Sequence, residues 1–206
     1  MNIPSYNREF VFATVSMDDY IRRFRDAERV AGYCRECRNY GHHWGCPPFD
    51  YSVEEQLSRY REVLLVAARI YPTEQHLPME TGMQCLWPVR SELEKIVRGL
   101  ETVLDGRAMG LAGQCPYCGA QPENFHAGMP CAKTEGKPCR HADLVRPSLE
   151  AWGFDIGMSA EQLLHIPILW STDGLTPEYF TLVCGFFHNA LPEEAVATLQ
   201  KIMATR

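Results

Sequence analysis

The sequence predicts a single domain of the α+β or α/β class, in which helices flank a mixed sheet and two cysteine-rich loops extend from it. Candidate strands and helices alternate along the chain, which is typical of a sheet with helices packed against it. The 206 residues suffice to bury one full hydrophobic core. The composition, 46% hydrophobic and 22% charged, is that of an ordinary globular protein. We therefore treat residues 1–206 as one domain, with cysteine loops at 34–50 and 113–141.

The first predicted elements are a strand over Phe10–Val15 and a helix over Met17–Ala31. Ser16 is a suitable N-cap, because its hydroxyl can accept a hydrogen bond from a backbone N–H of the first helical turn. Gly32 is a typical residue just beyond the end of a helix. Cys34–Asp50, which glycine and proline interrupt repeatedly, is expected to be a loop.

The clearest predicted helix spans Pro88–Leu104. It has proline in its first turn, apolar residues three or four positions apart, and glycine after its end. Before it, Val53–Tyr60 predicts a shorter helix, and the apolar run Val63–Tyr71 predicts a buried strand. After it, Arg107–Leu111 predicts a strand that leads into the second cysteine loop.

Four elements are predicted in the remainder of the chain. Leu144–Trp152 predicts a short helix that ends at a glycine. Ile166–Trp170 and Tyr179–Phe187 predict strands, and the connection between them contains the turn signal Asp-Gly. Pro192–Met203 predicts a final helix with proline near its start.

Composition and charge argue against several classes of protein. The net charge is −6 and no long basic run is present, so we expect no binding to nucleic acid. The longest apolar stretches, such as Val63–Ala68 and Phe180–Phe187, are too short to cross a bilayer. The first residues show no cationic flank followed by an apolar core, so no signal peptide is expected. We therefore expect a cytoplasmic protein without a membrane partner.

The nine cysteines are the most informative feature of the sequence. In a reducing compartment, clustered cysteines more often bind metal or perform chemistry than form disulfides. Their number is odd, which excludes complete pairing. Seven of them fall in the two loops and are our candidate ligands: Cys34, Cys37, Cys46, Cys115, Cys118, Cys131 and Cys139.

The second loop places four thiols within 25 residues, with the spacing CxxC-x12-C-x7-C. Four thiolates suit a zinc ion or a [4Fe–4S] cluster. The CPYC of Cys115–Cys118 is also the sequence of a glutaredoxin-type dithiol, but that site needs a helix whose N-terminus lowers the first thiol's pKa. Gly119 and Pro122 oppose such a helix. Metal binding is therefore favoured over a redox dithiol, and also over cysteines that merely pack in a core.

The first loop supplies three thiols, and Pro47 and Pro48 follow Cys46 directly. A proline after a cysteine is typical of iron–sulfur loops. His42 and His43 are candidate fourth ligands, although loop histidines often meet only solvent or a carbonyl.

Two further cysteines lie outside the loops. Cys85, in a predicted loop, is the better thiol candidate for a fourth ligand of the first group. Cys184 lies on the buried face of a predicted strand, which is more typical of a core thiol. Without a fourth protein ligand, a three-cysteine cluster would keep one open iron for a small molecule.

The segment CRECRNYGHHWGCPPF, the CxxC loop and GKPCRHADLVRPSLEAWGFDIG together resemble the domain of unknown function 2284 family, whose members are predicted metal-binding proteins. The resemblance covers roughly residues 33–187. It implies a small cytoplasmic prokaryotic protein with a cysteine-ligated metal, expected to be iron–sulfur, and no known reaction. It also implies that the seven loop cysteines are the family's two ligand groups. Relative to the family's spacing, Gly119–Pro130 is expected to be an insertion.

The segment after the last loop cysteine carries Arg140, His141 and Arg146. Positive charge beside a cluster would raise its reduction potential. Glu150 is a candidate hydrogen-bond acceptor near the ligands. Because Arg146 and Glu150 are four residues apart, the alternative is a simple ion pair on a helix surface.

Three functions follow from these patterns. The first is an iron–sulfur protein with one or two [4Fe–4S] clusters, which transfers electrons or assists a partner redox protein. The second is a zinc-binding structural or interaction module. The third is an enzyme that uses an open three-cysteine cluster. Iron–sulfur is favoured over zinc because the Cys-Pro-Pro group fits cluster ligation better, and no nucleotide or hydrolase motif supports another catalytic class.

Overall fold

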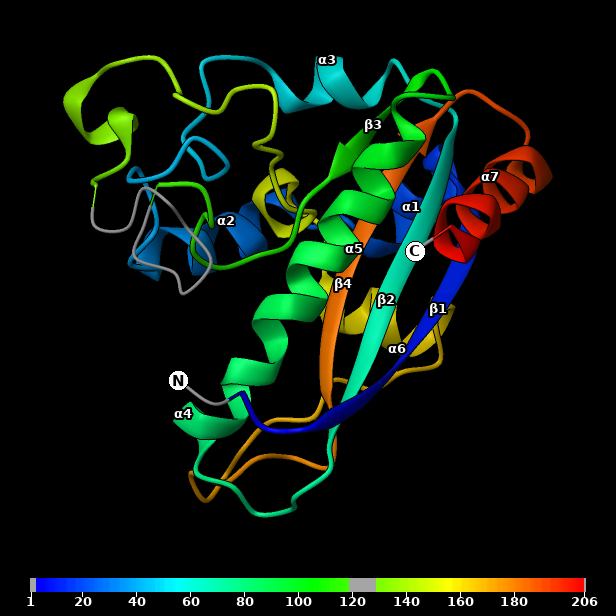
Figure 1. The fold of residues 1–206 in the computed structure, drawn as a ribbon. Coiled ribbons are helices and arrows are strands. Elements are labelled where there is room, and N and C mark those ends of the chain that lie inside the picture. Colours follow the sequence, from blue (N-terminus) through cyan, green and yellow to red (C-terminus); the bar gives the residue numbers. More distant parts are fainter. Residues whose placement is uncertain (1–2, 119–128, 206) are drawn as a thin grey trace.

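The computed structural model of the chain describes residues 3–118 and 129–205. Its centre is a four-stranded sheet with the strand order β1-β2-β4-β3 (Figure 1). Each pair of neighbouring strands is antiparallel, so the fold is α+β, one of the two classes that the sequence predicts, and the sheet is antiparallel rather than mixed. The strands are β1 (Tyr6–Ser16), β2 (Glu62–Pro72), β3 (Gly106–Met109) and β4 (Phe180–His188).

Strand β2 lies at the middle of the sheet and is covered on both faces. Val63, Leu65 and Ala67 belong to one hydrophobic core, and the alternate residues Leu64 and Val66 belong to another. This alternation follows from the pleat of a strand, in which successive side chains point to opposite faces. The continuous apolar run seen in the sequence is therefore the signature of a strand buried on both sides.

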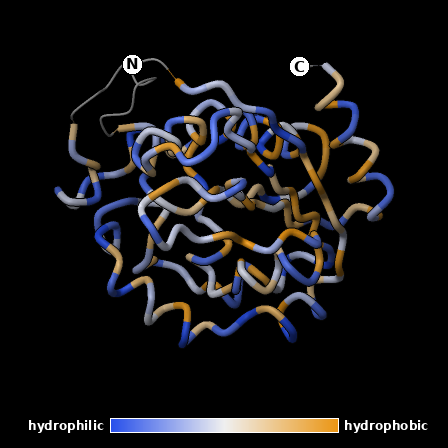
Figure 2. The backbone as a smooth tube through the Cα atoms, turned by 90° about the horizontal axis from the view of Figure 1, so that it is seen from below, coloured by the Kyte–Doolittle hydropathy of each residue, from blue (hydrophilic) through white to orange (hydrophobic). Residues whose placement is uncertain are grey.

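Helices cover each face of the sheet (Figure 1). On one face, α5 (Leu86–Leu100) and α7 (Pro192–Ala204) pack in one core with β2 and β4. On the other, α1 (Met17–Phe24) and α6 (Ile156–Leu163) surround a core rich in aromatic residues. In Figure 2 the last helix, next to the C-terminus, alternates hydrophobic and hydrophilic residues, as an amphipathic helix on the surface should. The other helical elements are α2 (Ala27–Glu36), α3 (Val53–Leu57), α4 (Met79–Gly82), η1 (Met83–Cys85), η2 (Ala132–Glu135) and η3 (Glu150–Trp152).

The single helix predicted over Met17–Ala31 is wrong. Ser16 caps α1 as expected, by accepting from the Asp19 amide at 3.3 Å. The chain then becomes extended at Arg25, and Asp26 caps a second helix by accepting from the Arg29 amide at 3.1 Å. A second side-chain cap thus starts a new helix within the predicted one.

Helix α2 also changes the expected first cysteine loop. Gly32 lies inside α2 rather than after its end, so the helix continues to Glu36. Cys34 is therefore in the last helical turn and Cys37 is the C-cap residue. The prediction of a loop over Cys34–Asp50 holds only beyond α2.

Other boundaries differ in smaller ways. Helix α5 begins two residues before Pro88 and ends at Leu100 rather than Leu104. The predicted strand Ile166–Trp170 is wrong: Ile166 is buried in a core, but the segment pairs with no strand of the sheet. Helix α6 was not expected, although Asp155 caps it by accepting from the Met158 amide at 2.8 Å.

The second cysteine segment leaves and re-enters the domain at one point. Gly110, directly after β3, donates from its amide to the Pro147 carbonyl at 2.8 Å and forms a bridge with Ser148. A Cβ atom at Gly110 would lie 2.9 Å from the Arg146 carbonyl oxygen, so glycine permits this approach. The two ends of residues 111–146 are therefore held together at the end of β3.

No helix of the described residues has both the length and the apolar character needed to cross a membrane.

Candidate metal centre

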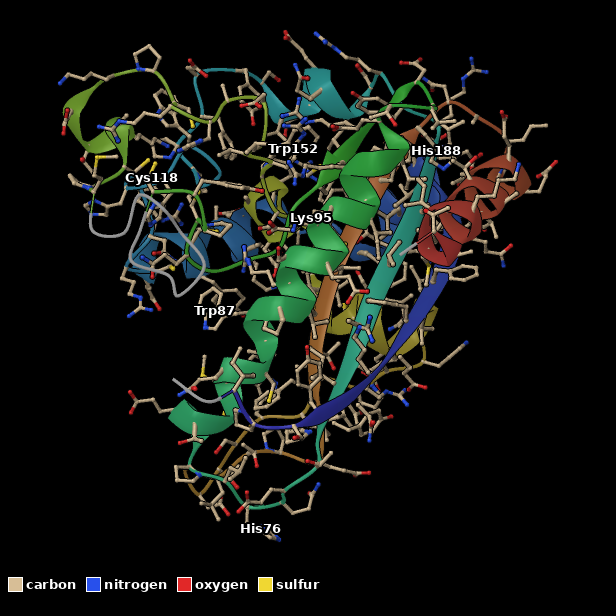
Figure 3. The ribbon with its side chains drawn as sticks, viewed as in Figure 1. His76, Trp87, Lys95, Cys118, Trp152 and His188 are labelled. Carbon is tan, nitrogen blue, oxygen red and sulfur yellow. The ribbon has the colours of Figure 1, made fainter. Side chains whose placement is uncertain are left out.

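The two cysteine segments, far apart in sequence, lie side by side at one end of the molecule. In Figure 3, Cys118 marks this region, at the upper left of the view. One link between the segments is Lys133 in η2, whose ammonium donates to carbonyls of the first segment. These are the carbonyls of His43 at 3.2 Å, Cys46 at 2.7 Å and Pro48 at 2.9 Å.

Aromatic rings complete the surroundings of this ammonium. Nζ of Lys133 lies 5.6 Å from the ring centroid of Trp44 and 5.9 Å from that of Phe49, within the range of cation–π attraction. The Trp44 indole in turn donates to the Lys137 carbonyl at 3.2 Å. Burial lowers the pKa of Lys133, and the nearby thiols of Cys46 and Cys131 act in the opposite direction. The first cysteine segment is thus anchored to the second through backbone carbonyls and ring faces.

The three thiols of the first group lie where α2 ends and in the turns that follow. Cys37 is exposed, and Cys34 and Cys46 are partly buried. Burial raises the pKa of Cys46 to about 11, and the neighbouring thiols of Cys37 and Cys34 add to this shift. Burial also raises the pKa of Cys34, and the last turn of a helix further disfavours an anion there. The thiols of Cys34 and Cys46 therefore stay protonated at neutral pH unless a cation displaces the protons.

The four thiols of the second group are also mutually close. Burial raises the pKa of Cys115 to about 12, and Cys131, Cys118 and Cys139 each contribute repulsion. Cys118 and Cys131 are buried. The Cys139 sulfur accepts from the His141 amide at 3.4 Å. The raised pKa of Cys115 is the reverse of what a glutaredoxin-type dithiol requires.

Within the sequence motif CPYC, Pro116–Cys118 form a turn rather than the start of a helix, and the described part ends at Cys118. The predicted insertion Gly119–Pro130 lies outside the described residues from position 119 to position 128, so its place in the site stays a prediction.

Cys131 connects the two groups electrostatically. It raises the pKa of Cys115 and Cys139 in its own segment, and also that of Cys46 in the other. Within residues 3–118 and 129–205, however, no three His, Cys, Asp or Glu side chains converge in a geometry that could hold a metal ion. The thiols are gathered in one region, without a common centre among the described atoms.

The donor set suits a soft metal. Thiolates select zinc and iron–sulfur clusters over hard cations such as magnesium. Cys34, Cys37, Cys46, Cys115, Cys118, Cys131 and Cys139 would hold it, with the loss of their protons on binding.

Of the expected fourth ligands, the structure brings His43 to the first group. Nε2 of His43 lies 3.2 Å from the Asn39 amide oxygen, and Nδ1 is buried without a hydrogen-bond partner in the described residues. Burial lowers the pKa of His43, which favours the neutral imidazole that binds metals. His42 is exposed.

Cys85 and Cys184 lie elsewhere. Both are buried in the core that α5 and α7 cover. The Cys85 thiol donates to the Pro4 carbonyl and the Cys184 thiol to the Val66 carbonyl, each at 3.5 Å. Neither lines the cavity described next, so the structure does not bring them to the first group.

A cavity of about 240 Å³ is lined by residues of both cysteine segments, α5 and β3. Its lining includes all three thiols of the first group, but only Cys115 of the second. Three charged residues of α5, Arg90, Glu94 and Arg98, also line it. The sequence reasoning missed them, although Arg90 was visible as a charge within the apolar stripe of the helix.

Arg90 and Glu94 form a nearly buried ion pair. Arg90 Nη2 lies 3.1 Å from a Glu94 carboxylate oxygen, and the same guanidinium donates to the carbonyls of Leu111 at 2.9 Å and Ala112 at 2.6 Å. Helix α5 therefore holds the beginning of the second cysteine segment.

Arg146 does not pair with Glu150 as the surface-pair alternative predicts. Its guanidinium binds both carboxylate oxygens of Glu101, at 2.9 and 2.6 Å. Glu150 instead lines the cavity, and its Oε2 is buried with no hydrogen-bond partner among the described residues. Burial raises the pKa of Glu150.

The positive charge expected after Cys139 is largely committed to other contacts. Arg146 pairs with Glu101, and Arg140 donates to the Pro130 carbonyl at 2.9 Å. The His141 ring lies 5.9 Å from that of Tyr117.

Comparison with protein-family models gives a match over residues 21–184, to the family described as "Predicted metal-binding protein (DUF2284)". The matched range contains both cysteine segments and most of the sheet. Comparisons with curated proteins and with solved structures give no significant match.

Proposed function

Because the chain belongs to the DUF2284 family of predicted metal-binding proteins, we propose that its two cysteine segments hold iron–sulfur clusters and serve electron transfer. The cofactor would be one or two [4Fe–4S] clusters, ligated by the seven loop thiols. The electron donor or acceptor would be a partner redox protein. One observation carries the proposal: Lys133 joins the segments and gathers seven thiols in one region.

The chemistry of the thiols supports a bound cation. Burial raises the pKa of Cys46 to about 11 and that of Cys115 to about 12, and the ammonium of Lys133 opposes the shift of Cys46. Several mutually repelling thiolates become favourable only when a metal compensates their charge.

Iron–sulfur is preferred to zinc for two reasons. A zinc site closes with four ligands, whereas the first group offers three thiols beside a cavity. The Cys-Pro-Pro sequence after α2 is also typical of cluster loops. Zinc in the second group, as a structural site, is the alternative.

The test is anaerobic purification followed by visible absorption, iron, acid-labile sulfide and zinc analysis on the same sample. A broad band near about 400 nm, with about four irons and four sulfides per cluster, supports the proposal. A colourless protein with stoichiometric zinc contradicts it.

Single variants then assign the ligands. Cys46→Ser and Cys115→Ser each remove one thiol from one group and should lower the iron content. Cys85→Ser is the matched control, since it removes a buried thiol that is bonded to the Pro4 carbonyl. Equal iron in all three variants would refute ligation by the loops.

A second candidate function, catalysis at an open metal, is favoured by the asymmetry of the cavity. The complete first group lines it, and the second group contributes one thiol. A metal held by Cys34, Cys37 and Cys46 would therefore have its free side next to this cavity. Spectral shifts on adding small molecules to the reduced protein would test this function.

A further inference from the structure

The cavity beside the first cysteine group has the size and walls of a small-molecule site. Its volume of about 240 Å³ is below the ~300–1,000 Å³ of pockets for drug-sized ligands, so its occupant should be smaller. The apolar part of the lining includes Val97, Met109 and Leu111, all buried. Mainly apolar walls with a few polar groups are typical of ligand sites.

Three of the lining residues carry a buried polar atom that finds no partner in the described residues. These atoms are Nδ1 of His43, Nε of Arg90 and Oε2 of Glu150. Buried polar groups in folded proteins are almost always hydrogen-bonded, so unpaired ones grouped around one cavity need an explanation. A bound molecule with hydrogen-bonding groups would supply the missing partners.

The lining carries three guanidiniums, Arg90, Arg98 and Arg146, and two carboxyl groups, Glu94 and Glu150, and one of the guanidiniums is available to an anion. Arg90 is neutralised by Glu94, and Arg146 by Glu101. Arg98 meets no carboxylate among the described residues. Its Nε lies 3.4 Å from the Glu94 carbonyl oxygen, and its guanidinium carbon lies 6.0 Å from the ring centroid of Tyr117. The guanidinium of Arg98 is therefore the cation of this lining that lacks a counter-ion.

We infer that this cavity binds a small organic acid, with its carboxylate on Arg98 and its apolar body against Val97, Met109 and Leu111. A guanidinium matches a carboxylate in geometry and can bind it through two parallel hydrogen bonds. The inference rests on the proposed function and deepens it, because the acid would lie beside the thiols of the first group. Binding itself requires α5 and the apolar wall.

The test uses benzoate, which joins a carboxylate to a compact apolar body, and benzamide, which keeps the shape without the charge. Both are titrated calorimetrically into the full chain, purified anaerobically as in the metal analysis. Benzoate should bind at least about tenfold more tightly than benzamide, because hydrogen bonds from a guanidinium to a carboxylate are stronger than those to a neutral amide.

Arg98→Gln should remove this preference and leave benzamide binding unchanged. Arg59→Gln is the matched control, since Arg59 is exposed and does not line the cavity. Val145→Phe, which adds a ring at a partly buried lining position, should weaken both probes. Absence of benzoate binding, equal affinities for the two probes, or insensitivity to both lining variants would overturn the inference.

Metal content separates this result from that of the proposed function. Iron in the sample without benzoate binding refutes the acid site alone. Benzoate binding that depends on Arg98, in a sample without iron or sulfide, supports the acid site and refutes the iron–sulfur proposal.

Discussion

Replacement of Lys133 by methionine tests whether one ammonium joins the two cysteine segments. Methionine keeps the length and much of the apolar stem but removes the charge and all three hydrogen bonds to the carbonyls of His43, Cys46 and Pro48. A hydrogen bond to a charged group contributes about 1.5–3 kcal/mol. Because Lys133 is partly exposed and water replaces some of these contacts, we expect a total loss of about 2–4 kcal/mol.

That loss corresponds to a fall in melting temperature of roughly 6–12 °C for a chain of this size. The assay is thermal unfolding followed by circular dichroism, with iron analysis of the same samples. Lys137→Met is the matched control, since it removes an equal charge four residues away, where Lys137 is exposed and pairs with Glu135 on the surface. The control should shift stability by less than about 0.5 kcal/mol. If the Lys133 and Lys137 variants have the same melting temperature, the link between the segments does not stabilise the protein and the reasoning fails.

Three further predictions concern charge and metal. Glu150→Gln should raise the free energy of unfolding at pH 7. Burial raises the folded pKa of Glu150 above its unfolded pKa, so the wild-type protein loses stability as pH rises above the unfolded pKa. Chemical denaturation at pH 4 and pH 7 measures this loss, and a variant with the wild-type pH dependence would contradict the assignment. Cys115→Ser should lower both bound metal and melting temperature, whereas Cys184→Ala should keep its metal; metal loss in the Cys184 variant would make that thiol a ligand. After a chelator has removed the metal, the free energy of unfolding should fall as pH rises above 9. Burial raises the folded pKa of Cys46 to about 11, whereas the unfolded thiol ionises near 9.0. Urea titrations of the metal-free protein that coincide at pH 8 and pH 10 would argue against this.

The elements that the sequence predicted well are those whose own residues determine them. Strand β2 was visible as an apolar run, and α5 as an apolar stripe with proline in its first turn. The break between α1 and α2 was missed because it depends on tertiary contacts. Arg25 bridges to Phe154, and a Cβ atom at Gly153 would lie 2.8 Å from Cα of Ala27. Such contacts join residues more than a hundred positions apart, which no local pattern records.

The candidate site also combines features that the local sequence determines with features that depend on the fold. Thiol identity and spacing are local, so the seven candidate ligands could be named from the sequence. The cavity could not, because Arg98 and Glu150 come from different parts of the chain and meet only in the fold. The role of Lys133 was also hidden, since it contacts backbone carbonyls that any residue would provide.

The two ends of the second cysteine segment are held together beside β3, and this arrangement affects how far the length of the segment can vary. Gly110 is bonded to Pro147 and bridged to Ser148, so these residues fix the two ends of the segment at the sheet. The entropy of closing a loop grows only slowly with its length, and each doubling costs about 0.6 kcal/mol. Residues could therefore be added or removed between the ligands, away from the contacts of Lys133 and Arg90, at little cost to the rest of the domain. The spacing of the cysteines can change during evolution while the sheet stays the same.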